Sequence, residues 1–166
     1  MKGRDLFGGG VAVGFVGTGK VRHQRNRGDR GAGFQALVGG LNGFEVGADG
    51  WIMGPLWFKG QVVKMNPADG AISVIADGFK VPAAANLDGK GNLWVVDTRA
   101  GQLLKVDLTS GQKTMVRQLS SAIDNLAIAP EGTIYVSNMA DNGVQAFDPA
   151  TGSLRQLTSG KLAVPG

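Results

Sequence analysis

The 166-residue sequence contains no cysteine and a single histidine, His23. Without cysteine the chain can form neither a disulfide framework nor a thiolate metal site. With one histidine, a single copy cannot assemble a multi-histidine zinc site, and no Ser-His-Asp triad is indicated because His23 lies outside any ordered pattern. The sequence also lacks any run close to the roughly 18 apolar residues that a membrane helix needs. Val11–Val16 is too short and too interrupted by glycine to be the core of a signal peptide, which favours the cytoplasm without deciding the compartment.

Most of the chain has no excess of positive or negative charge. The net charge is +4, yet residues 1–40 alone carry seven basic and two acidic residues. The remaining 126 residues are close to neutral, with 10 basic and 11 acidic residues. The basic run Arg22–Arg30 contains no aromatic residue that could stack on a base. We therefore expect neither a nucleic-acid partner nor a membrane partner.

Residues 1–40 contain twelve glycines and little apolar periodicity. They predict an irregular Gly/Arg-rich leader in which Val11–Val16 is the one expected strand. The segment Gly14–Val21 resembles a phosphate-binding loop, but Val21 stands where a Ser or Thr must reach Mg²⁺. No amphipathic helix follows to hold the phosphate at its N-terminus. We interpret this spacing as chance.

From residue 41 onward the sequence repeats with a period of 41 residues. Asp49-Gly50-Trp51-Ile52 is followed at this interval by Lys90-Gly91-Asn92-Leu93 and by Glu131-Gly132-Thr133-Ile134. Each copy reads as four short strands separated by turns rich in Gly, Asp and Asn, which is typical of β-propeller blades. We predict an all-β propeller domain over residues 41–166, with four-stranded blades at about 42–82, 83–123 and 124–164. The expected strands are 44–46, 51–53, 61–65 and 71–76, then 84–87, 93–96, 103–106 and 113–117, then 126–129, 134–136, 144–147 and 153–157.

Three blades are fewer than the four to eight that typically close a propeller. An unclosed array leaves sheet edges and apolar faces uncovered. The chain could be a fragment of a longer protein, two copies could form a homodimer that closes a six-bladed ring, or residues 1–40 could form an irregular cap. We favour a fragment whose first 40 residues are foreign to the fold.

Polar residues recur where a propeller blade meets its central channel. The start of the innermost strand and the end of the second strand lie at the same rim. The period places Asn42, Asp124 and Asn125 at inner-strand starts, and Asp97 and Asn138 at second-strand ends. Together they would form a ring of oxygen donors, which suits Ca²⁺ or Mg²⁺ rather than a soft metal. The alternative for each residue is a turn position bonded to the local backbone.

Three segments, Leu41–Gly47, Leu93–Asp97 and Ile123–Ala127, resemble the six-bladed propellers of the regucalcin/gluconolactonase (senescence marker protein) family. The resemblance implies a divalent cation in the central channel, Ca²⁺ first, with Mg²⁺, Mn²⁺ or Zn²⁺ as alternatives. It also implies hydrolysis of a small-molecule substrate such as a sugar lactone, where the metal polarises the carbonyl and a carboxylate activates water. Asn42 matches the asparagine of the family's metal site.

The family's metal-binding Asp comes from the start of a later blade. The next blade here offers Ala83, so Asp124, one blade further on, is the acidic ligand expected beside Asn42. Asp97 is the remaining candidate for a catalytic base or a substrate contact, and the rim positions of Asn125 and Asn138 make them candidate substrate contacts. Trp57 lies in the loop between the second and third strands of the first blade, where its size suits either a contact with substrate or buried packing. Residues 1–40 contain no Glu to complete the ligands, so we expect one chain to be an incomplete catalyst. The alternative function is a non-catalytic propeller that serves as a binding scaffold.

Overall fold

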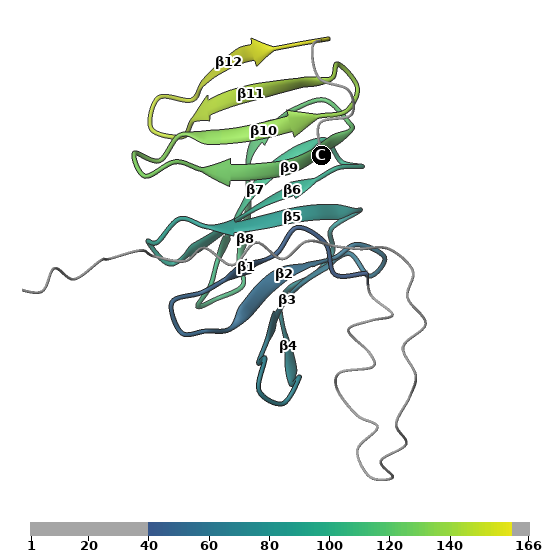
Figure 1. Ribbon diagram of the computed structural model, residues 1–166, viewed down its shortest axis with the longest axis vertical. Coiled ribbons are helices and arrows are strands. Elements are labelled where there is room, and N and C mark those ends of the chain that lie inside the picture. Colours follow the sequence, from purple (N-terminus) through teal and green to yellow (C-terminus); the bar gives the residue numbers. More distant parts are fainter. Residues whose placement is uncertain (1–39, 161–166) are drawn as a thin grey trace, which may run out of the picture.

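The computed structural model describes residues 40–160, which form three four-stranded antiparallel sheets and no helix (Figure 1). Each sheet consists of four strands that are consecutive in sequence, as expected for blades. The expectations for the leader up to residue 39 and for residues 161–164 lie outside this range. None of the residues in this range forms a helix able to cross a membrane. Blade 1 contains β1 (Glu45–Val46), β2 (Ile52–Leu56), β3 (Gln61–Met65) and β4 (Ile72–Ala76); blade 2 contains β5 (Pro82–Leu87), β6 (Asn92–Asp97), β7 (Gln102–Asp107) and β8 (Lys113–Gln118); blade 3 contains β9 (Ile123–Ile128), β10 (Ile134–Asn138), β11 (Gly143–Asp148) and β12 (Ser153–Thr158).

Two of the three innermost strands begin earlier than the sequence pattern predicts, whereas β1 begins one residue later, at Glu45. β9 was expected from residue 126 but starts at Ile123, which pairs with Asn138 beyond a register shift in β10. β5 likewise starts at Pro82, which pairs with Asp97 across a similar irregularity. The extra residue at such a bulge interrupts the alternation of inward and outward side chains, so periodicity alone does not detect the strand beyond it.

The turn between the third and fourth strands is built identically in all three blades. An Asn or Asp side-chain oxygen accepts a hydrogen bond from the amide two residues later, at 2.9 Å for Asn66, 3.0 Å for Asp107 and 2.8 Å for Asp148. A glycine ends each turn with a backbone in the left-handed region, a conformation that residues with a side chain rarely adopt. These glycines, four residues after the Asn or Asp, are Gly70 (φ 72°), Gly111 (φ 70°) and Gly152 (φ 72°).

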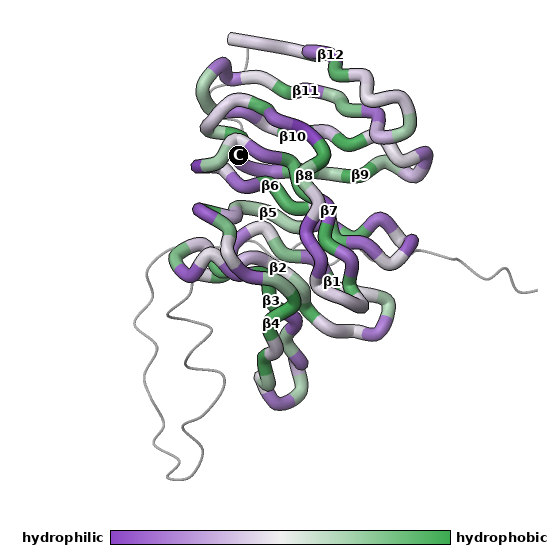
Figure 2. Tube along the Cα trace, turned by 180° about the vertical axis from the view of Figure 1, so that it is seen from behind, coloured by the Kyte–Doolittle hydropathy of each residue, from purple (hydrophilic) through white to green (hydrophobic). Residues whose placement is uncertain are grey.

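The middle strand of blade 2 is buried on both faces. Leu93 and Val95 of β6 belong to the apolar cluster shared with blade 1, whereas Trp94 and Val96 belong to the cluster shared with blade 3. Full burial of each such side chain contributes roughly 1.5–3 kcal/mol. Figure 1 shows the blades in chain order along the molecule, with β5 between β2 and β9. Figure 2 shows the accompanying hydropathy, with apolar residues along the strands and hydrophilic residues at the turns.

Blades 1 and 2 are joined at their inner strands by hydrogen bonds as well as by apolar packing. The amide of Ala85 donates to the carbonyl of Gly43 at 2.9 Å. The Glu45 carboxylate accepts the amide of Leu87 at 2.5 Å and lies 3.3 Å from the Asn86 amide nitrogen. A Cβ at Gly43 would lie 2.6 Å from the Cβ of Ala84, so this close approach requires glycine. The residue before Gly43 is therefore held at the rim of the sheets.

Candidate functional site

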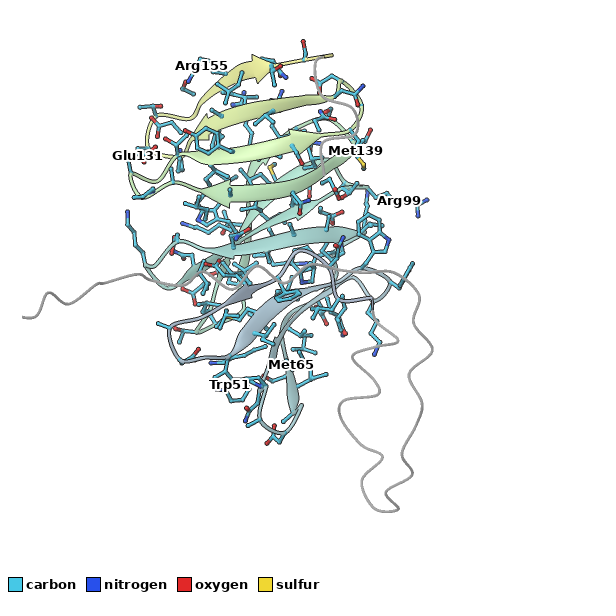
Figure 3. The ribbon with its side chains drawn as sticks, in the orientation of Figure 1. Trp51, Met65, Arg99, Glu131, Met139 and Arg155 are labelled. Carbon is cyan, nitrogen blue, oxygen red and sulfur yellow. The ribbon has the colours of Figure 1, made fainter. Side chains whose placement is uncertain are left out.

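An open pocket of about 390 Å³ lies between the rims of blades 1 and 3. Blade 1 contributes the segment before β1 and the residues after β2, and blade 3 contributes the start of β9 and the residue after β10. Figure 3 shows Met139 of this pocket at one end of the sheets, opposite the end that carries Glu131. The lining is mostly apolar, with two side chains that carry oxygen: it consists of Gly40, Leu41, Asn42, Trp57, Phe58, Asp124 and Met139.

Asn42 enters the pocket from a segment pinned to the second strand of its own blade. Its amide donates to the carbonyl of Pro55 at 3.1 Å, and the Trp57 amide donates to the carbonyl of Gly40 at 3.0 Å. The Asn42 side chain is exposed, and its Oδ1 accepts the amide of Gly43 at 3.0 Å. The backbone of Asn42 is thus fixed. Its side-chain NH₂ group and the second lone pair of Oδ1 can still bond to a ligand in the pocket.

Asp124 is the acidic group of the pocket, and its environment differs from that of the other aspartates. The side chain is half-buried, and burial raises the pKa of its carboxyl group. Its nearest donor is the Asn125 amide nitrogen, 3.5 Å from Oδ2. By contrast, hydrogen bonds lower the pKa of Asp107 and of Asp148 in their turns. A partly buried carboxylate with few hydrogen-bond donors is stabilised when it binds a proton or a cation.

Asp97, the predicted base, does not line this pocket. It is 2% exposed, and its carboxylate accepts three backbone amides: Lys80 at 2.6 Å, Val81 at 3.0 Å and Ala100 at 3.1 Å. These bonds hold the chain that enters β5 against the end of β6. Only the bond to Ala100 is of the local kind raised as the alternative from the sequence, because the Lys80 and Val81 amides lie 17 and 16 positions away. No substrate contact follows from this geometry.

Asn138 occupies the same position one period later and is used in the same way. It is buried, its Nδ2 donates to the hydroxyl of Ser120, and its Oδ1 accepts the amide of Ala140 at 2.9 Å. Asn125 lies on β9 beside Asp124, where its backbone amide donates to Ser137 Oγ at 2.9 Å. Neither asparagine lines the pocket, and their roles as substrate contacts stay predictions.

The structure brings together three of the six residues singled out from the sequence: Asn42, Trp57 and Asp124. It adds Phe58 and Met139, which are exposed apolar side chains on the same lining. Met139 has no counterpart in the motifs of the sequence. The one available signal is its place directly after a second strand, where the first blade carries Trp57.

The donor set fits a divalent cation only in part. Within residues 40–160 no group of three or more His, Cys, Asp or Glu side chains is arranged to hold a metal. The pocket offers one carboxylate and one amide oxygen, whereas Ca²⁺ takes six to eight oxygen ligands. A cation held by Asn42 and Asp124 of one chain would therefore keep most of its coordination sphere as water.

No family model and no curated protein matches the sequence. Solved structures do match, at sequence identities that show the fold alone. The fold is that of a β-propeller. A chain from a nidogen/laminin complex aligns with a TM-score of 0.68 and 12% identity, over 75% of this chain and 50% of that chain. A streptogramin B lyase aligns with a TM-score of 0.64 and 12% identity, over 76% of this chain and 43% of the lyase.

A gluconolactonase from Xanthomonas campestris is also among the similar structures. It aligns with a TM-score of 0.62 and 14% identity, over 72% of this chain and 47% of the enzyme. This propeller chain therefore spans about half the length of the solved chains that it matches. The propeller prediction is confirmed, and at 14% identity the likeness to the gluconolactonase shows the fold alone.

Proposed function

We propose that the rim pocket binds a small carbonyl compound, of which a sugar lactone is the leading candidate, together with a divalent cation, Ca²⁺ first. The observation that supports this proposal is the meeting of Asn42, Asp124 and Trp57 in one pocket from two different blades. The similarity in fold to a gluconolactonase is compatible with it.

The residues of the pocket divide the work by their chemistry. Asp124 and Asn42 supply oxygen ligands for the cation, and the indole of Trp57 with the ring of Phe58 covers the hydrocarbon part of the substrate. When bound, the cation supplies Lewis acidity toward the substrate carbonyl. Asp97 is buried and bonded to backbone amides, so it does not serve as the base in this proposal. Among the described residues, the pocket of one chain therefore supports binding and polarisation better than a full hydrolytic cycle.

A second candidate function is a binding module without catalysis. The absence of a three-ligand cluster among residues 40–160 favours it, as does the mostly apolar lining. One similar propeller was solved within a nidogen/laminin complex, which shows that this fold also occurs in a protein assembly.

Calorimetric titration of the full chain with CaCl₂, followed by glucono-1,5-lactone, tests the two candidates. We expect Ca²⁺ binding that is lost in Asp124→Asn and weakened in Asn42→Ala. Asp148→Asn is the matched control, because it removes the same charge from a turn in which blade 1 naturally carries an asparagine, Asn66. Ca²⁺-dependent lactone hydrolysis supports the enzyme, and lactone binding without turnover supports the binding module. A chain that binds neither Ca²⁺ nor lactone contradicts the proposal.

A further inference from the structure

The first and last blades each present an apolar face that has no partner among the described residues. On blade 1, Phe44 is 44% exposed, although the equivalent residue of blade 2, Ala85, is fully buried against blade 1. Ile52 is likewise partly exposed, whereas its equivalents Leu93 and Ile134 are fully buried at the two internal interfaces. These two positions, which are buried at the internal interfaces, are thus partly uncovered on blade 1, although Val63 of β3 is buried.

The far face of blade 3 shows the complementary pattern. Leu157 is 41% exposed, whereas its blade 2 equivalent Val116 packs into the cluster between blades 2 and 3. Val144 is partly exposed, whereas its equivalents Leu103 and Val62 are fully buried. This face has the side-chain positions that blades 1 and 2 use to contact the next blade.

The outermost strand serves as an internal reference. Val74 on the open face of blade 1 is 53% exposed, and its equivalent Met115 is 52% exposed even though blade 2 has a neighbour on that side. This outer-strand position therefore remains exposed whether or not a blade has a neighbour, so its exposure on blade 1 does not indicate a missing partner. The excess exposure on blade 1 lies instead at Phe44, beside β1, and at Ile52 of β2.

We propose that two copies of this chain close head to tail into a six-bladed ring, with blade 3 of each copy packed on blade 1 of the other. Within the chain, faces of these two kinds already pack against each other twice, between blades 1 and 2 and between blades 2 and 3. The contact between blade 3 and blade 1 of the partner repeats this packing. Because three blades are half of a six-bladed ring, a half-turn repeats this head-to-tail contact and closes the assembly after two copies. Six blades lie within the range at which propellers close. The described blades span about half of the solved propeller chains that they match.

Closure also completes the rim pocket, a consequence that rests on the proposed function. The inner-strand starts of one chain carry Asn42, Ala83 and Asp124 in that order. Within a chain, Asn42 and Asp124 line one pocket from blades that are not adjacent, because blade 2 with its buried Ala83 lies between them. In the ring, Asp124 is on the blade next to the partner subunit's Asn42. The channel then holds two carboxylates and two amide oxygens, which is closer to the ligand set that Ca²⁺ requires.

The mass of the full chain in solution, measured by light scattering after size exclusion, tests ring closure. We expect twice the chain mass of 17.2 kDa. Phe44→Glu should reduce the mass to that of one chain, because it places a charge in the new interface. Val74→Glu is the control on the same face and should leave the mass doubled. A wild-type monomer that unfolds cooperatively, or a ladder of open oligomers, overturns the proposal.

Two damaged variants can separate loss of an interface from loss of folding. Leu157→Glu damages the opposite face and should also be monomeric on its own. In a mixture of Phe44→Glu and Leu157→Glu, one of the two contacts joins two undamaged faces, so a mixed dimer should appear in native mass spectrometry with one variant isotope-labelled. Failure of the two folded variants to associate, while the wild type is dimeric, overturns the pairing of unlike faces.

Mixing also tests the shared pocket. Asp124→Asn should lose Ca²⁺ binding and Asn42→Ala should weaken it. A randomly refolded mixture should recover tight binding at about a quarter of the wild-type stoichiometry, because half of its rings are mixed and one of the two interfaces of a mixed ring joins an intact Asp124 to an intact Asn42 of the partner subunit. A dimeric wild type that binds Ca²⁺ without such recovery overturns the shared pocket. A dimeric wild type that binds no Ca²⁺ refutes the proposed function and leaves the ring, which the mass decides.

Discussion

Asp124 lies half-buried at the start of β9, and burial raises the pKa of its carboxyl group above the ordinary value of 3.8. The folded state then binds the proton more tightly than the unfolded state. Stability therefore falls as the pH rises from the unfolded pKa through the raised folded pKa, and the ionised side chain is unfavourable at neutral pH. An acidic residue kept at this cost is consistent with a group reserved for a ligand.

Asp124→Asn should accordingly increase the free energy of unfolding at pH 7, and the difference from wild type should vanish at a pH below both pKa values. Urea unfolding at pH 7 and at low pH measures it at fixed protein concentration. Asp148→Asn should show the opposite sign, since hydrogen bonds from Thr151 and Ala150 lower the pKa of Asp148 in the folded state. A loss of stability in Asp124→Asn at pH 7 would contradict the assignment of Asp124 as an unsatisfied carboxylate.

Asp88 shows the reverse balance in the turn between β5 and β6. Burial raises the pKa of its carboxyl group, but donors from Asn92, from the Lys90 amide and from the indole of Trp94 outweigh burial and hold the pKa below 3.8. The Lys90 amide lies at 2.7 Å and the Asn92 side-chain nitrogen at 2.8 Å. The stabilising contribution is therefore present above the unfolded pKa and is lost as the pH falls through the folded pKa.

Asp88→Ala should lower the free energy of unfolding at pH 7 by about 1–3 kcal/mol, because it leaves several donors without their acceptor. The loss should shrink in acid, where the wild-type carboxylate is protonated as well. Asp69→Ala, which removes a single exposed turn bond to the Ala71 amide, is the control and should cost less. Equal costs for the two variants in urea unfolding would show that the bonds of Asp88 contribute little.

Turn elements repeat more faithfully than their surroundings. Gly111 and Gly152 end equivalent turns with φ values of 70° and 72°, so an alanine meets the same backbone resistance at both. Their surroundings differ. A Cβ on Gly111 would lie 2.3 Å from the carbonyl oxygen of Ile75 in blade 1, whereas a Cβ on Gly152 would meet open space. Blade 2 is thus seated on blade 1 at a point where only glycine fits.

Gly152→Ala should destabilise the fold by about 1–2 kcal/mol through its left-handed backbone alone. Gly111→Ala should cost more, by about 1–3 kcal/mol, since it also overpacks the contact between blades. Thermal or urea unfolding of the two variants measures the difference directly. If both alanines cost the same, the contact between Gly111 and Ile75 is not tight in solution.

Strand elements were predictable where side chains alternate and turns carry Gly with Asn or Asp. In β6 the side chains of Leu93 and Val95 point to one face and those of Trp94 and Val96 to the other, because successive side chains of any strand point to opposite faces. The beginnings of β5 and β9 were not predictable, because Pro82 and Ile123 pair beyond register shifts. A bulge is decided by the partner strand, not by the alternation of its own sequence.

For the whole molecule, ring closure predicts that stability depends on protein concentration. The folded dimer is favoured by mass action, so the wild-type Tm should rise with concentration, whereas the Tm of Phe44→Glu should not. Differential scanning calorimetry over a wide concentration range measures this dependence. A wild-type Tm that is the same at all concentrations would argue for a folded single chain with open ends.

The sequence by itself determined the 41-residue period, the twelve strands and the turn chemistry. These features follow from alternation and from short-range bonds, such as that of Asp107 to the amide of Thr109. Only the tertiary structure decided which polar residues stay available. Asp97 and Asp124 look alike in the sequence, yet Asp97 is consumed by the amides of Lys80 and Val81, which lie 16 or more positions away. Among residues 40–160, no backbone amide from a distant segment donates to Asp124, so its carboxylate stays available in the pocket. Which carboxylate receives hydrogen-bond donors depends on which distant segments the fold brings beside it.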